Sequence, residues 1–144
     1  MLVSKILETK PEGGVISVKP DVTVGDAAKV LSQKKIGTLV VSSDGAALDG
    51  ILSERDIVRA LGANGTGCLT ENVSELMTAK IITCSPTDQA DTVLGKMTEG
   101  RFRHMPVMDG NKMIGLISIG DVVKARLAEL SMEKDALQGM IMGH

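Results

Sequence analysis

Two serine–aspartate pairs with the same spacing are the residues of this chain best suited to chemistry. Ser53 is followed three residues later by Asp56, and Ser118 is followed in the same way by Asp121. A hydroxyl and an acid at this spacing, just before an apolar run, are typical of the first turn of a helix, where they cap free backbone N–H groups. The same groups suit a nucleotide, because a short carboxylate accepts hydrogen bonds from a ribose diol and a hydroxyl beside helix N–H groups suits a phosphate.

Aspartate at both sites favours the nucleotide interpretation over capping alone. Its side chain is shorter than that of the glutamate preferred in a capping box, so we expect it to reach the cap backbone less well. Capping nevertheless remains the alternative for both pairs.

Each pair lies in one copy of an internal repeat. Residues 50–60 return as residues 115–125, with glycine, two aliphatic residues, serine, two variable residues, aspartate, two aliphatic residues, a base and alanine in the same order. Weaker matches join residues 3–7 to 73–77 and residues 16–20 to 82–86. A fixed period in a short chain predicts one structural unit used twice, so a site built on that unit is expected in two versions.

Each copy predicts the same order of elements: strand, helix, strand, strand, helix. Alternating or continuous apolar residues predict strands at residues 16–18, 38–41 and 50–52 and at residues 82–84, 105–108 and 115–117. Helices are predicted from Val24 and Ala90, where apolar residues recur at helical spacing, and again from Ser53 and Ser118.

The predicted fold class is therefore mixed α/β (α+β), with two β-α-β-β-α units and an extended C-terminal helix. The predicted domains are residues 1–62 and 73–128, joined by a linker at 63–72 and followed by a helical extension at 129–144. A unit of about 60 residues is too small for a good core of its own. We therefore expect the two units to pack around a pseudo-twofold axis.

The last helix carries a heptad-like apolar seam. The seam is interrupted by Lys134 and consists of Val123, Leu127, Leu130, Leu137 and Ile141. Two interpretations stay open, a helix that packs on its own domain and a helix that meets a partner subunit.

Composition excludes several classes of function. The net charge is −2 and Phe102 is the only aromatic residue, which argues against a nucleic-acid-binding protein. No apolar run approaches the length of about 18 residues that a membrane span needs, so no membrane partner is expected. Two cysteines without a pairing framework suit a reducing compartment, so we expect a cytoplasmic protein. Cys84 is expected to be a small buried hydrophobe.

Catalysis and metal binding find no support in the sequence. The histidines and cysteines are too few and too widely spaced for a metal site. Neither serine lies in a nucleophile elbow, and there is no phosphate-binding glycine loop. A small nucleotide-hydrolysing enzyme is therefore only a rival hypothesis, and we expect no enzyme.

The repeated Gly-h-h-Ser-x-x-Asp motif (h, aliphatic), with a matching strand and helix before each copy, resembles tandem CBS domains (cystathionine-β-synthase domains), the pair called a Bateman module. The basic and aliphatic-Pro-Val run at residues 100–107 adds to the resemblance, which covers about residues 3–125. The chain looks like the short stand-alone bacterial type. The resemblance implies an aspartate on ribose, a serine on phosphate, and a regulatory module that binds AMP first, with ATP, ADP or NAD(H) next. It also implies a homodimer and a further protein partner, with no required cofactor.

The two copies are not equal in charge. Arg55 corresponds to Gly120, whereas Arg103 and His104 correspond to Gly37 and Thr38. We expect two unequal clefts that each borrow phosphate contacts from the other copy. The predicted nucleotide-binding residues are Ile16, Ser17, Val18, Gly37, Thr38, Ser53, Arg55, Asp56, Ile82, Thr83, Cys84, Arg101, Arg103, His104, Met105, Pro106, Ser118 and Asp121. The alternative is a structural dimerisation module with vestigial sites.

Overall fold

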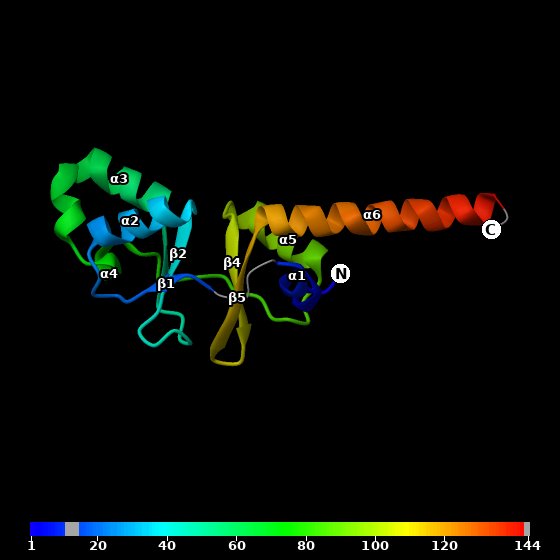
Figure 1. The fold of residues 1–144 in the computed structure, drawn as a ribbon, viewed down its shortest axis with the longest axis horizontal. Helices are drawn as coiled ribbons and strands as arrows, with labels where there is room; N and C mark the ends of the chain where they lie inside the picture. Colours follow the sequence, from blue (N-terminus) through cyan, green and yellow to red (C-terminus); the bar gives the residue numbers. More distant parts are fainter. Residues whose placement is uncertain (11–14, 143–144) are drawn as a thin grey trace. The chain divides into compact units, whose positions relative to one another are not determined.

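The computed structural model describes residues 1–10 and 15–142, which group into two compact units (Figure 1). Unit 1 holds residues 1–10, 83–108 and 115–142, and unit 2 holds residues 15–82 and 109–114. Both units mix helices and strands, which confirms the predicted fold class. No helix within the described ranges is long and apolar enough to cross a membrane.

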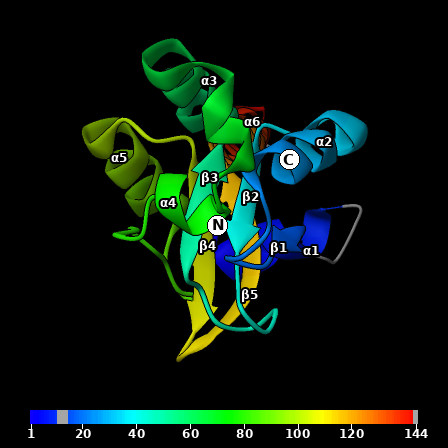
Figure 2. The same ribbon diagram turned by 90° about the vertical axis from the view of Figure 1, so that its left-hand side faces the viewer.

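Unit 2 is built on a three-stranded sheet with the order β1-β2-β3 (Figure 2). Strand β1 (Ser17–Val18) pairs in parallel with β2 (Thr38–Val41), and β2 pairs antiparallel with β3 (Gly50–Ser53). Helices α2 (Val24–Lys34), α3 (Glu54–Asn64) and α4 (Val73–Leu76) complete the unit. Its core consists of Val24, Ala27, Leu31, Leu39, Val41, Leu52, Ile57 and Val73.

The predicted apolar stripe of α2 is therefore confirmed as the buried face of that helix. Its start is also confirmed, because the Thr23 side chain accepts a hydrogen bond from the Asp26 N–H. The segment predicted as a linker contains a 3-10 helix, η1 (Gly65–Thr70), whose Cys68 is buried. This segment is thus a packed part of unit 2.

Unit 1 contains the two long helices of the second copy, α5 (Ala90–Gly100) and α6 (Ile119–Ile141). Strands β4 (His104–Asp109) and β5 (Lys112–Ser118) form a two-stranded sheet. The core of unit 1 consists of Val3, Ile6, Cys84, Ala90, Val93, Met97, Met105, Val107, Ile117, Val122 and Ala125.

The prediction of a strand at residues 82–84 is wrong. Of these residues, Cys84 alone pairs with another strand, through a single parallel bridge to Val107. The reason is Pro106. In unit 2 the Val40 N–H donates to Ile16 O, and the corresponding donor in the second copy would be the backbone nitrogen of Pro106, which carries no hydrogen. The ladder stops there, and Ile82 is left 50% exposed.

The repeat copies and the compact units divide the chain differently, because the short helix that opens each copy packs with strands of the other. Helix α1 (Val3–Thr9) belongs to unit 1, and α4 of the second copy belongs to unit 2. A Cβ added at Gly115 would lie 2.6 Å from Leu7 Cδ2, and one added at Gly50 would lie 2.5 Å from Met77 Sδ. The glycine of each repeated motif thus leaves room for a side chain from the short helix that opens the other copy.

Helix α6 extends well past the core of its unit. Its buried residues are Val122 and Ala125, both near its start. The Met1 ammonium pairs with Glu129 at 2.7 Å, and residues 130–138 and 140–142 are all exposed. The first part of the helix therefore packs on its own unit, whereas the second part does not.

Candidate functional site

Both serine–aspartate pairs begin helices, as the sequence predicts. Ser53 is the N-cap of α3 and Ser118 is the N-cap of α6. Each hydroxyl accepts a hydrogen bond from the aspartate N–H, at 3.3 and 3.1 Å, and each carboxylate accepts one from the serine N–H, at 2.8 and 2.9 Å. Both pairs therefore form complete capping boxes.

This geometry corrects the argument from side-chain length. Aspartate reaches the cap backbone at both sites, so capping alone accounts for the residue type. The reciprocal bonds occupy only Oδ2 of each carboxylate. Oδ1 of Asp56 lies 3.6 Å from Arg59, a side chain that is 77% exposed. At Asp121, the cap and the Lys10 ion pair both use Oδ2. One carboxylate oxygen at each helix start therefore takes no part in the cap.

The strand that precedes each motif is fixed beside the helix start by a backbone hydrogen bond. Glu54 N–H donates to Gly37 O at 2.9 Å, and at the matching place Ile119 N–H donates to Arg103 O at 2.8 Å. In unit 2, Thr38 also pairs with Ser53 across the sheet. The structure thus brings Gly37 and Thr38 to the first helix start.

By the same bond, unit 1 brings Arg103 and His104 to the start of α6, beside Ser118 and Asp121. Arg103 is exposed and His104 is half-buried. Burial and the nearby cations Lys10 and Arg103 lower the pKa of His104, while Asp121 opposes them. His104 is therefore a neutral imidazole at neutral pH.

The residues predicted to line the adenine slots lie on or beside the same strands. Ser17 and Val18 pair with β2, and Cys84 pairs with β4. Cys84 is buried, and burial is the main cause that raises the pKa of its thiol to about 11, which confirms it as a small buried hydrophobe. Ile82 belongs to unit 2, whereas Thr83 and Cys84 belong to unit 1.

The side chains of Met105 and Pro106 are not available to a ligand. Both are buried, and Met105 is part of the unit 1 core. Only their backbone groups remain for a ligand, and Pro106 O already accepts from Cys84 N–H at 3.0 Å.

The remaining predicted basic residues are exposed. Arg101 ends α5 in a left-handed conformation with φ 57°, and its repeat counterpart Lys35 ends α2 in the same way with φ 55°. Arg55 lies in the first turn of α3, in unit 2. Its predicted contact with a site of the other copy stays a prediction.

Lys10 is a site residue that the sequence interpretation missed. Its ammonium lies 3.0 Å from Asp121 Oδ2 and donates to Leu116 O at 2.7 Å. Burial acts to raise the pKa of Asp121, but the Ser118 N–H and Lys10 outweigh it, so the pKa lies below its ordinary value. The offset that matches residues 3–7 to 73–77 also matches Lys10 to Lys80, and this repetition was the available signal.

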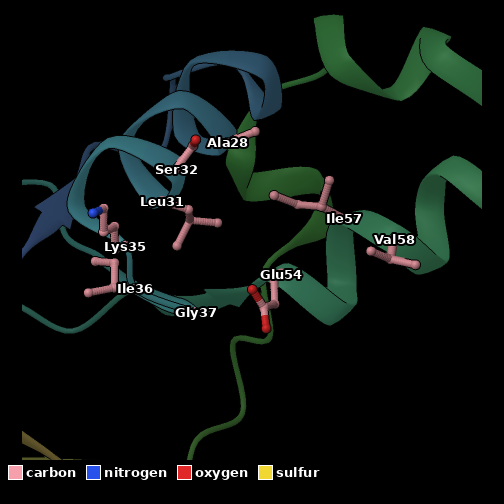
Figure 3. Close-up of a pocket in the computed structure, with 9 residues that line it drawn as sticks. All are labelled: Ala28, Leu31, Ser32, Lys35, Ile36, Gly37, Glu54, Ile57 and Val58. Carbon is pink, nitrogen blue, oxygen red and sulfur yellow. The ribbon is translucent and has the colours of Figure 1, made fainter.

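A groove of about 530 Å³ lies between α2 and α3 of unit 2 (Figure 3). Leu31 of α2 and Ile57 and Val58 of α3 line its apolar part, and Gly37 and Glu54 also line it. Neither Ser53 nor Asp56 is among its lining residues. The groove therefore adjoins the start of α3 through Gly37 and Glu54, but the capping pair does not line it. Within the described residues there is also no group of acidic, histidine or cysteine side chains that could hold a metal ion.

Solved structures similar to this chain include ligand-bound ones. The crystal structure of CBSX2 in complex with AMP is 28% identical, with a TM-score of 0.74, and the match covers 88% of this chain and 96% of that one. The CBS domain pair of protein MJ0100, in complex with 5′-methylthioadenosine and S-adenosyl-L-methionine, is 27% identical with a TM-score of 0.76, over 90% of this chain and 98% of that one.

Comparisons over nearly the whole chain agree on the family. A CBS-domain-containing protein from Agrobacterium tumefaciens is 41% identical with a TM-score of 0.82, over 88% of this chain and 99% of that one. The mitochondrial CBS-domain-containing protein CBSX3 of Arabidopsis thaliana is 36% identical, over 98% of this chain and 72% of its own length. The family model of the CBS domain matches residues 3–63 and 73–128. The repeated helix starts are thus two CBS motifs, and the chain belongs to the CBS-domain family as a tandem pair.

Proposed function

We propose that this chain is a regulatory module that binds an adenosine-containing ligand at the starts of α3 and α6. AMP is the first choice, and ATP, ADP or NAD(H) come next. The observation that carries the proposal is the constellation that recurs in both units. A strand end is bonded to the first turn of a helix whose capping aspartate keeps one carboxylate oxygen for a further partner.

The roles follow from chemistry. Asp56 and Asp121 accept hydrogen bonds from the ribose hydroxyls through the oxygen that the cap leaves over. The hydroxyls of Ser53 and Ser118, with the N–H groups of the first helical turn, receive phosphate. The apolar segments at residues 16–18 and 82–84 receive the adenine ring.

The ligand-bound relatives support this assignment, because their adenosine ligands share a ribose and an adenine. Regulation requires that the ligand bind two conformations with different affinity, and that a protein partner respond to the difference. No catalytic step and no cofactor enter the proposal.

Isothermal titration with AMP, ATP, NADH and S-adenosylmethionine tests the proposal. We expect saturable binding of at least one of them at micromolar to low millimolar concentration. If none of the four binds at millimolar concentration, the proposal is wrong and the alternative, a dimerisation module with vestigial sites, is favoured. Release of product from ATP above background would instead support an enzyme.

The proposal includes a homodimer in which α6 takes part. The seam residues Val123, Leu127, Leu130, Leu137 and Ile141 are all exposed in the single chain. Apolar side chains at heptad spacing are stabilised when they leave water and pack against a second helix with the same pattern. A second copy of this chain supplies such a helix.

A further inference from the structure

The position of the Lys10 side chain bears on which ligand the unit 1 site prefers, a question that the Ser-x-x-Asp motif does not answer. It comes from the segment after α1 and ends at the carboxylate of Asp121, at the start of α6, and both lie in unit 1. The side chain is 33% exposed, so the ammonium is neither fully buried in the core nor free in solvent.

The ammonium retains capacity for a further partner. Of its three protons, one goes to Leu116 O at 2.7 Å and one to Asp121 at 3.0 Å. Within residues 1–10 and 15–142, these two oxygens are the acceptors that the ammonium contacts. An anion next to Asp121 would therefore find a donor that is already held in place.

A second cation, Arg103, lies at the same helix start as this ammonium. Lys10 and Arg103 both lower the pKa of His104, so the imidazole beside them is neutral at neutral pH. The charge of the Asp121 carboxylate in this cluster is already balanced by Lys10.

The matching helix start in unit 2 has a different charge. Its first helical residue is Glu54, where unit 1 has Ile119. A Cβ added at Gly37 would lie 3.4 Å from Glu54 Oε1, so this carboxylate lies over the strand end. Lys80, the repeat counterpart of Lys10, is exposed. Within the described residues 15–142, no ion pair joins Lys80 to Asp56.

We propose that Lys10 makes the unit 1 site selective for adenosine ligands that carry a 5′-phosphate. The proposal rests on the proposed function and names the ligand class of one of its two sites. A phosphate gains a charge-assisted hydrogen bond from the ammonium. A neutral thioether such as 5′-methylthioadenosine gains none, and the sulfonium cation of S-adenosylmethionine is repelled.

The test compares AMP with 5′-methylthioadenosine by isothermal titration, in an Asp56→Ala background that weakens the unit 2 site. In Lys10→Met we expect AMP affinity to fall about tenfold or more, while 5′-methylthioadenosine affinity changes less than about twofold. Lys10→Arg, which keeps the charge, retains most of the preference for AMP. Lys5→Met is the matched control, because Lys5 is an exposed lysine of α1 that pairs with Glu8 on the same helix.

The outcomes separate the inference from the proposed function. Equal weakening of both ligands in Lys10→Met would show that Lys10 only positions Asp121, and an unchanged AMP affinity would show that it touches no phosphate; either result overturns the inference alone. If the background protein and the wild type bind neither ligand, the proposed function fails and the inference fails with it. Thermal unfolding followed by far-UV circular dichroism verifies that each variant is folded.

Discussion

At the scale of single residues, the two aspartates perform one task that is visible and one that is proposed. Each completes a capping box through Oδ2, and each keeps Oδ1 for a further partner. The side chains of Asp56 and Asp121 are 15% and 27% exposed, so both remain within reach of solvent. A variant that keeps the cap and moves the carboxylate separates the two tasks.

Asp56→Glu and Asp121→Glu are such variants, because Ser-x-x-Glu is the preferred capping box. We expect the stability of each glutamate variant to stay within about 0.5 kcal/mol of wild type. Adenosine-ligand affinity at the altered site should fall about tenfold, because the longer side chain displaces the carboxylate from the ribose. Asp→Ala at the same positions should lower both affinity and stability, the latter by about 1 kcal/mol. Calorimetry and far-UV unfolding measure the two effects.

The control for this pair of effects is Thr23, the N-cap of α2, whose hydroxyl accepts a hydrogen bond from the Asp26 N–H. It is not among the predicted ligand residues. Thr23→Ala should lower stability by about 1 kcal/mol without changing affinity. If it weakened the ligand as much as Asp56→Ala does, the loss would reflect destabilisation and not a ribose contact.

His104 makes the stability of unit 1 sensitive to pH. Because burial, Lys10 and Arg103 lower its pKa, the unfolded chain takes up a proton near the ordinary value of 6.5 while the folded chain does so only at lower pH. Stability must therefore fall as pH drops below about 6.5. Wild type should lose more stability than His104→Gln between about pH 7.5 and 5.5 in denaturant titrations. If the free energy of unfolding changes with pH to the same extent in both proteins, the prediction is wrong.

At the scale of elements, the close approach of α4 to the start of β3 explains why the repeated motif begins with glycine. The Thr78 backbone is held by two hydrogen bonds with Ile51, at 2.9 and 3.0 Å. A Cβ at Gly50 would lie 3.1 Å from Thr78 O and 2.8 Å from Met77 Cγ. The side chain of Met77 can move, but the paired backbone of Thr78 cannot move without breaking its hydrogen bonds.

Gly50→Ala is therefore expected to destabilise the fold by about 1–3 kcal/mol, the usual range for overpacking. The measurement is urea unfolding followed by far-UV circular dichroism, since the chain has no tryptophan or tyrosine. Gly95→Ala is the matched control. Gly95 lies inside α5 with nothing within 4 Å of an added Cβ, so this change should stabilise the helix by about 0.5–1 kcal/mol. If the Gly50→Ala protein is as stable as wild type, Met77 and Thr78 move aside at no cost and the prediction is wrong.

At the scale of the whole molecule, the exposed half of α6 is the feature that a single chain does not explain. Leu130 and Leu137 lie beyond the last buried residue of the helix, with their apolar surface in water. If α6 joins two copies, Leu130→Glu together with Leu137→Glu should convert a dimer to a monomer. Size-exclusion chromatography with light scattering measures the molar mass.

Ser131→Glu is the control for this substitution, because it adds a charge to the same exposed part of α6 outside the seam. It should leave the molar mass unchanged. A wild-type monomer at about 100 μM would contradict the homodimer. A double variant that remains dimeric would place the interface elsewhere on the chain.

The sequence by itself determined the fold class and the starts of the two motif helices. These features depend on local chemistry: the spacing of apolar residues, the Ser-x-x-Asp caps and the repetition of both. The hydrogen bonds that hold Gly37 beside the start of α3 and Arg103 beside the start of α6 are a finding of the structure. The arrangement of the two copies about a pseudo-twofold axis stays a prediction from the repeat.

Only the tertiary structure decided which segments pack together and what reaches each site. Helix α1 of the first copy joins the second copy's strands, and this exchange brings Lys10 to Asp121 across more than a hundred residues of sequence. Pro106 removes one ladder hydrogen bond and shortens a predicted strand, and Met105 is drawn into the core. Long-range packing of this kind depends on which surfaces fit together, and no local pattern of residues encodes that fit.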